Sequence, residues 1–149
     1  MFAKYDIWYS FNMNPVGSEI NLSFNQLVGT NSTRPYVVVR NPVFTAIGII
    51  NYNGKKYYGV SPNTLEISYG IDNNSISTAT FTIQLQDLIN KTIIATIGPI
   101  TQSGSDISYY KASTSQLSNI PYSETRFEVD AKITGNTSVR LYSVKLILN

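Results

Sequence analysis

Apolar and polar side chains alternate along most of the chain, and turn residues interrupt the alternation about every 8 to 12 positions. In the segment Ser77 to Gln86, every second residue from Ala79 to Leu85 is apolar, with threonine or glutamine between. Successive side chains of a β-strand point to opposite faces, so a chain with this period folds into sheets that each bury one face. The pattern predicts an all-β protein, an antiparallel β-sandwich of nine or ten strands, with residues 1–149 as a single domain.

The dipeptide Asn53-Gly54 is the clearest turn signal in the chain. It separates two segments rich in strand-forming residues, Ile49–Tyr52 and Lys55–Tyr58. Asn-Gly is favoured in the type I′ turn, in which both central residues need a positive φ, so a tight hairpin is predicted here. Lys55 and Lys56 would then stand at its tip, where lysines discourage edge-to-edge pairing with other strands.

The carboxy-terminal part of the chain predicts a further pair of strands, Phe127–Ile133 and Val139–Leu148. The first of them carries a row of alternating residues that we interpret as solvated charges on its outer face: Arg126, Glu128, Asp130 and Lys132. The second strand is apolar on both faces. A strand of this kind is normally central in its sheet or covered by another subunit, so Leu141 and Ile147 are candidate interface residues.

The chain contains no histidine and no cysteine. This excludes Ser-His-Asp and Cys-His catalysis, thiol redox chemistry, and the usual zinc, haem and iron–sulfur ligand sets. Glu128 and Asp130 have a spacing that a glycosidase could use, but the alternating charges around them favour the solvated row. We therefore expect a protein that is not an enzyme, with no catalytic residue, no metal site and no cofactor.

The charge of the chain argues against a nucleic-acid partner. The formal net charge is +2, and Lys4 is the only basic residue within residues 1–30. So weak a field, without a basic arm, predicts no direct contact with nucleic acid. The longest nearly apolar run, Ile93–Ile100, is far shorter than the roughly 20 residues of a membrane helix, and the amino terminus has no apolar core of signal-peptide length. Neither a transmembrane segment nor standard export is expected.

Aromatic residues are the strongest candidates for a binding surface. Tyr5–Phe11 is a predicted strand, and the adjacent pairs Tyr57-Tyr58 and Tyr109-Tyr110 would each place one ring outside a sheet. Exposed rings could form a stacking platform for sugars or an interface between proteins, whereas partly buried rings with hydrated hydroxyl groups would belong to the core. The full set of candidate interface or stacking residues is Trp8, Tyr52, Tyr58, Tyr110, Tyr122, Leu141 and Ile147.

Charged residues make up only 13% of the chain, and Asn, Ser and Thr supply most of its polarity. A surface poor in charge lets subunits pack closely without desolvating ions. In this composition, its strand count and its final pair of strands, the chain resembles the small single jelly-roll coat and spike proteins of icosahedral viruses, including archaeal ones. The resemblance implies a jelly-roll-like sandwich that serves as a structural virion protein, capsid or capsid-associated. It would assemble in the host cytoplasm with copies of itself and other structural proteins, without the basic arm that many such coats carry.

A second function stays open. The chain could be a carbohydrate-binding or adhesion module of the β-sandwich type at the extracellular surface, with a glycan as its partner. Exposed tyrosines and Trp8 would then form the stacking platform. Assembly in solution would favour the virion protein, whereas glycan binding that is lost in Trp8→Ala or Tyr58→Ala would favour the module.

Overall fold

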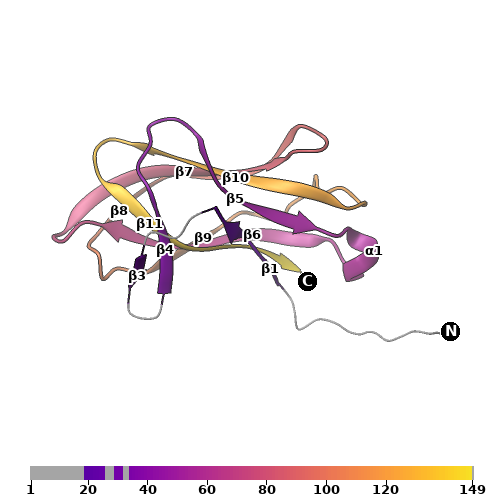
Figure 1. Cartoon of the computed structure of the whole chain (residues 1–149), viewed down its shortest axis with the longest axis horizontal. Coiled ribbons are helices and arrows are strands. Elements are labelled where there is room, and N and C mark those ends of the chain that lie inside the picture. The colour runs from indigo at the N-terminus through magenta and orange to yellow at the C-terminus, as the bar shows by residue number, and fades with distance from the viewer. Residues whose placement is uncertain (1–18, 26–28, 32–33, 149) are drawn as a thin grey trace.

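The computed structural model describes residues 19–25, 29–31 and 34–148, so the predicted strand over Tyr5–Phe11 and the candidate Trp8 lie outside the described residues. Two sheets face each other and form an antiparallel β-sandwich (Figure 1). This confirms the predicted fold class. The described residues contain eleven strands, against the nine or ten expected, and one short helix, α1 (Lys55–Tyr58).

The strands divide between the sheets as follows. The six-stranded sheet has the order β3-β4-β11-β6-β9 with β1 beside β11, and its strands are β1 (Glu19–Asn21), β3 (Gly29–Asn31), β4 (Arg34–Val39), β6 (Pro62–Asp72), β9 (Tyr110–Ser113) and β11 (Ser138–Leu148). The five-stranded sheet has the order β2-β5-β10-β7-β8, and its strands are β2 (Ser23–Phe24), β5 (Thr45–Tyr52), β7 (Ser77–Asp87), β8 (Thr92–Gly104) and β10 (Thr125–Thr134).

Strand β7 shows how the alternation builds the core. It lies between β10 and β8, and its apolar residues Ala79, Phe81, Ile83 and Leu85 are all buried. They belong to one apolar cluster that both sheets supply. Burying a side chain of this size contributes about 1.5 to 3 kcal/mol, so the alternating pattern is the main source of the stability of the sandwich.

Strand β11 is central in its sheet, between β4 and β6. A β-bulge explains why its apolar residues occupy both alternating sets of positions in the sequence. The pairing with β6 changes register between Leu141 and Ser143, which is a β-bulge at Tyr142. A bulge adds one residue and so reverses which side chains face inward. Val139 and Leu141 before the bulge, and Val144 and Leu146 after it, therefore all point into the core. The interpretation of Leu141 as an interface residue is wrong, since it is fully buried within the chain.

The hairpin predicted at Asn53-Gly54 does not form. Gly54 has φ 94° and ψ 156°, which is not the type I′ conformation, and the residues after it form α1. Strand β5 pairs with β10 and β2, both distant in sequence. Long-range pairing has therefore overridden the local turn signal, and Lys55 and Lys56 do not stand on the edge of a strand.

Three other boundaries differ from the sequence pattern. Strand β8 continues through Gly98-Pro99, where a strand end is expected, because the register of β7 and β8 shifts at this point. As β8 is an edge strand, a proline there need not remove a ladder hydrogen bond. The mostly polar sequence of residues 29–35 favours a loop, but this segment contains β3 and the start of β4. The sequence pattern around Tyr109 and Tyr110 favours a strand over Ile107–Ala112, whereas β9 begins only at Tyr110 and ends at Ser113.

Candidate ligand-binding site

Three of the candidate tyrosines gather at one end of the sandwich. We call this region the tyrosine end and define it by Tyr52, Tyr57, Tyr58 and Tyr122. It surrounds α1, where β5 ends and where β6 and β10 begin (Figure 1). Tyr57, which is not among the candidate residues predicted from the sequence, is 72% exposed, and Tyr122 is 64% exposed. The alternating pattern does not predict the exposure of Tyr57 and Tyr122, because both residues lie outside strands.

A stack of rings connects the core to this surface. Tyr52 is 1% exposed and lies 5.6 Å from the ring of Phe127 and 5.5 Å from that of Tyr58. Tyr58 in turn meets Tyr57 edge to face at 5.0 Å. Burial raises the pKa of Tyr52 to about 12, with a smaller contribution from Tyr58. Tyr52 is therefore a core residue that supports the surface tyrosines and does not itself contact a ligand.

The backbone fixes Tyr122 beside α1. The Lys55 amide donates a hydrogen bond of 2.8 Å to the carbonyl of Tyr122, and the Gly59 amide donates one of 2.7 Å to the carbonyl of Lys55. A Cβ atom on Gly54 would stand 3.0 Å from both the Tyr122 carbonyl oxygen and the Glu124 amide nitrogen, so only glycine allows this close approach. The exposed ring is thus held on a rigid support.

Two hollows flank α1. The smaller has a volume of about 240 Å³ and is lined by Asn53, Gly54, Lys56, Tyr122, Ser123 and Glu124. The larger has a volume of about 440 Å³, and Lys55, Asn63, Gln116 and Leu117 are among its lining residues. An exposed ring beside amide, hydroxyl and charged groups can hold a ligand that has one apolar face and a polar rim.

The remaining candidates lie elsewhere. Tyr110 is half-buried on β9, its ring is 5.6 Å from that of Tyr69, and its hydroxyl donates to the carbonyl of Ser103 at 2.8 Å. Ile147 is half-buried on β11, in register with Glu19 of β1 and Thr64 of β6. Neither belongs to the tyrosine end.

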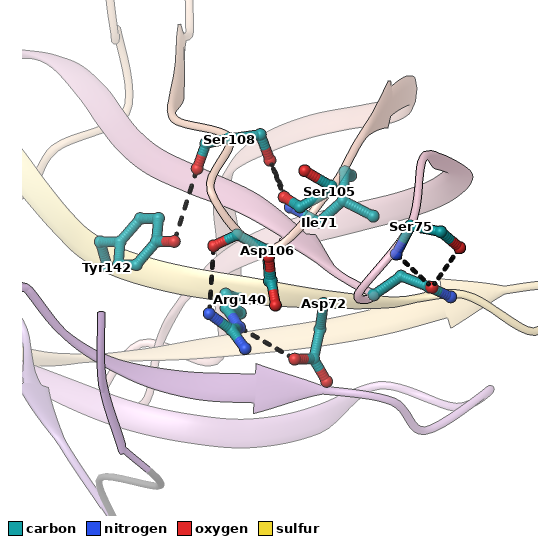
Figure 2. A network of polar contacts seen from close by, with 9 residues as sticks. Ile71, Asp72, Ser75, Ser105, Asp106, Ser108, Arg140 and Tyr142 are labelled. Atoms are coloured by element: carbon teal, nitrogen blue, oxygen red, sulfur yellow. Dashed lines mark hydrogen bonds and ion pairs between the residues drawn. The ribbon is translucent and has the colours of Figure 1, made fainter. Parts of the chain in front are cut away.

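A second cluster of polar and aromatic groups covers the outer face of the six-stranded sheet at the opposite end of β6 from α1 (Figure 2). The Arg140 guanidinium donates to Asp72 at 2.8 Å and to the Asp106 carbonyl at 3.2 Å, and it lies 4.5 Å from the ring centre of Tyr36. The Tyr142 hydroxyl donates to the Ser108 carbonyl at 3.5 Å. These contacts hold the segment before β9 against the sheet, which is a structural role.

The row of charges on β10 is only partly solvated. Asp130 is 6% exposed, accepts a hydrogen bond from the Gln86 amide, and hydrogen-bonds to Glu128. The interpretation of Asp130 as a solvated charge is therefore wrong. Burial, and secondly the neighbouring Glu128, raise the pKa of Asp130 to about 6. Lys132 on the same strand lies 4.8 Å from the ring centre of Phe44.

The raised pKa of Asp130 gives a testable pH dependence. The folded protein holds this proton more tightly than the unfolded chain, so the associated stability is fully present below pH ~4 and is lost as pH rises through about 6. In urea denaturation we expect the free energy of unfolding to fall by roughly 1 to 2 kcal/mol across this window, after allowance for solvent screening. Asp130→Asn should flatten the profile, whereas the exposed-carboxyl control Glu124→Gln should retain it. Equal slopes for wild type and Asp130→Asn would contradict the assignment.

The fold and the tyrosine end together define a β-sandwich module with a candidate ligand site at one end. The solved structures that share this architecture include the carbohydrate-binding module CBM6cm-2 of Cellvibrio mixtus lichenase 5A in complex with cellotriose. It has a TM-score of 0.51 and 10% identity, over 88% of this chain and 96% of that chain.

Two further matches are more distant. The CBM22-1-GH10 modules of Clostridium thermocellum xylanase 10B, complexed with xylohexaose, match at a TM-score of 0.42 and 15% identity, over 89% of this chain and 26% of that chain. The CBM22-1 xylan-binding domain of Paenibacillus barcinonensis Xyn10C matches at 0.38 and 11%, over 89% and 83%. No protein-family model and no curated protein matches the sequence.

The comparison corrects the first functional interpretation. The structure that shares this fold at a TM-score of 0.51 is a carbohydrate-binding module and not a virus coat. The prediction of a structural virion protein is therefore wrong, and the self-assembly and virion location that accompanied it lose their support. Within the described ranges no helix is long and apolar enough to cross a membrane, and no group of three or more acidic, histidine or cysteine residues could hold a metal ion.

Proposed function

We propose that the chain is a single carbohydrate-binding module of the β-sandwich type that binds a saccharide at the tyrosine end. The observation that carries the proposal is that Tyr122, which is largely exposed, lines a hollow whose other lining residues are mostly of polar types. The fold shared with a module whose structure contains cellotriose supports it. The location that we propose with this function is the extracellular surface.

The chemistry of the smaller hollow suits a sugar ring. A pyranose has one face of C–H groups, which packs on an aromatic ring, and hydroxyl groups around its edge, which need donors and acceptors. Tyr122 offers the ring, and Asn53, Ser123 and Glu124 offer an amide, a hydroxyl and a carboxylate. Tyr57 extends the exposed aromatic surface on α1.

The carboxyl groups favour binding over hydrolysis. Glycoside hydrolysis generally uses two carboxyls about 5 to 9.5 Å apart, and the residues that line the smaller hollow include one, Glu124. Asp130 and Glu128 hydrogen-bond to each other, so their carboxyl groups stand closer together than glycoside hydrolysis requires. We therefore propose a non-catalytic role.

The test is binding to a panel of immobilised glycans, followed by affinity measurement on each positive polymer. We expect Tyr122→Ala to weaken binding by about tenfold or more, because it removes the stacking face without disturbing a buried group. Tyr57→Ala should weaken it less. The control is Ile76→Ala, since Ile76 is 82% exposed in the turn between β6 and β7, at the other end of the sandwich. Binding to no glycan, or wild-type affinity in Tyr122→Ala, would refute the proposal.

A further inference from the structure

Lys55 and Lys56 have no carboxylate partner in the part of the chain that the structure describes. The ion pairs found there join Arg140 to Asp72 and Lys145 to Glu19 and Glu66. Both lysines are exposed, and both lie in α1. On a hairpin tip they would serve to discourage strand pairing, but the helix leaves no strand edge here to protect. Two adjacent unpaired cations beside a candidate ligand site thus lack the ordinary structural explanation.

Each lysine faces one of the two hollows. Lys56 lines the smaller, beside Tyr122, and Lys55 lines the larger. Among the residues that line the larger hollow there is no carboxylate, while Asn63 and Gln116 can donate amide hydrogens. In the smaller hollow the single carboxylate of Glu124 is accompanied by Lys56. Each hollow therefore has one of the two adjacent lysines of α1 among its lining residues.

The backbone of α1 fixes where these charges stand. The hydrogen bonds from the Lys55 amide to Tyr122 and from the Gly59 amide to Lys55 hold both ends of the turn, and Tyr58 is stacked on the core ring of Tyr52. The two ammonium groups can move on their own stems, but their attachment points do not move away from the hollows. An ammonium group is therefore within reach of a ligand that occupies either hollow.

We propose that the saccharide bound at the tyrosine end is acidic, with a carboxylate or sulfate group on its sugar rings that pairs with Lys55 and Lys56. This inference rests on the proposed function and specifies its ligand class. The lysine ammonium group is a compact point charge with three hydrogen-bond donors, so it can bind a carboxylate or a sulfate. A chain of sugars long enough to cross α1 can present one anionic group to each lysine.

A nucleic acid is the less favoured polyanion. Its binding requires many phosphate contacts from a basic stripe, whereas the net charge of this chain is +2 and Glu124 lies beside Lys56. Two lysines beside one carboxylate supply too little positive charge for that mode of binding.

The test uses the whole chain and five polymers: polygalacturonate, its fully methyl-esterified form, a sulfated galactan, the same galactan without sulfate, and single-stranded DNA. We expect one or both acidic polysaccharides to bind more tightly than their neutral partners, and the tighter of the two identifies the oxyanion. The double variant Lys55→Gln/Lys56→Gln should lose about fivefold to tenfold in affinity for the acidic polymer and little for the neutral one. The expected loss is modest because exposed ion pairs contribute little free energy. Raising the salt concentration from 50 to 500 mM should produce the same selective loss, because salt screens exposed charges.

The control is Lys91→Gln/Lys111→Gln, which changes the net charge equally with two exposed lysines outside α1. Equal losses in the two double variants would overturn the inference, since net charge alone would then explain binding. Equal affinity for acidic and neutral polymers, or tighter binding to DNA, would also overturn it. If neutral glycans bind through Tyr122 but acidic ones bind no better, only this inference fails; if no glycan binds, the proposed function fails as well.

Discussion

Replacing Phe127 with alanine is expected to lower the free energy of unfolding by about 3 to 5 kcal/mol. Phe127 is fully buried in β10, and its ring packs on Tyr52, which in turn packs on Tyr58. Alanine would leave a cavity at the base of this stack, and a close-packed core refills such a space only in part. A loss of this size is a large share of the roughly 5 to 15 kcal/mol that keeps an ordinary domain folded.

The same substitution should also act at a distance from the core. Without Phe127, Tyr52 and Tyr58 lose the ring that supports them, and the position of α1 becomes less well defined. Phe127→Leu, which keeps most of the apolar volume, is expected to stay folded and to bind glycan more weakly than wild type. Urea denaturation and affinity measurement on the same samples check both effects, with the exposed Ile76→Ala as control. A loss below about 1 kcal/mol in Phe127→Ala would contradict the packing described.

Gly70→Ala is expected to cost about 2 to 3 kcal/mol for a different reason. Gly70 lies in β6, next to the backbone of Ser108, which belongs to the segment before β9 that the contacts of Arg140 and Tyr142 hold against the sheet. An added Cβ would lie under 3.0 Å from the Ser108 carbonyl oxygen and 3.0 Å from the Tyr142 hydroxyl oxygen. Because the obstacle includes backbone, the segment before β9 must move outward and the hydrogen bonds that hold it must lengthen.

Denaturation and amide hydrogen exchange across β9 would measure this effect. The control is Gly135→Ala, where nothing stands within 4 Å of the new Cβ and the cost of about 1 kcal/mol comes only from its φ of 101°. Glycan binding should survive Gly70→Ala, since the tyrosine end is at the other end of β6. A Gly70→Ala protein as stable as wild type, with unchanged exchange in β9, would show that the close approach is not maintained in solution.

The alternating pattern predicts the sandwich because the hydrophobic periodicity and the burial agree in most strands. In β7 the four predicted core residues are all buried, together with the polar Thr82 and Asp87, and β10 and β11 lie close to their expected positions. The failures come from long-range pairing, which a local signal does not register. At Asn53-Gly54 the turn propensity is genuine, but β5 is paired on both sides by distant strands, so Lys55–Tyr58 has no strand to join.

β-Bulges lie next to the two side chains, Leu141 and Asp130, that are predicted to be exposed and are buried in the structure. One at Tyr142 turns Leu141 inward together with Val144, and another between Val129 and Asp130 interrupts the pairing of β10 with β5 next to the buried carboxyl. A strict period of two assigns each residue to one face along the whole strand, and a single inserted residue breaks that assignment. Sequence alone does not mark where the extra residue falls.

The tyrosine end could be predicted only in part. Tyr52, Tyr58 and Tyr122 were candidates because aromatic rings suit binding surfaces, and the structure brings them together. Their roles depend on burial: Tyr52 is the support, whereas Tyr57 and Tyr122 are the exposed rings. That division arises from the short helix α1 and from the segment before β10, neither of which has a periodic pattern in the sequence.

The central place of β11 also affects how the molecule is made. Its partners β1, β4 and β6 all precede it in the chain, so a ribosome synthesises all three before the strand that joins them. Until residues 138–148 emerge, β4 and β6 have open edges that expose unpaired backbone groups, the condition under which nascent chains aggregate or recruit chaperones. The six-stranded sheet is therefore completed only once β11 has been synthesised, and the yield of folded protein should depend on how well the edges of β4 and β6 are protected until then.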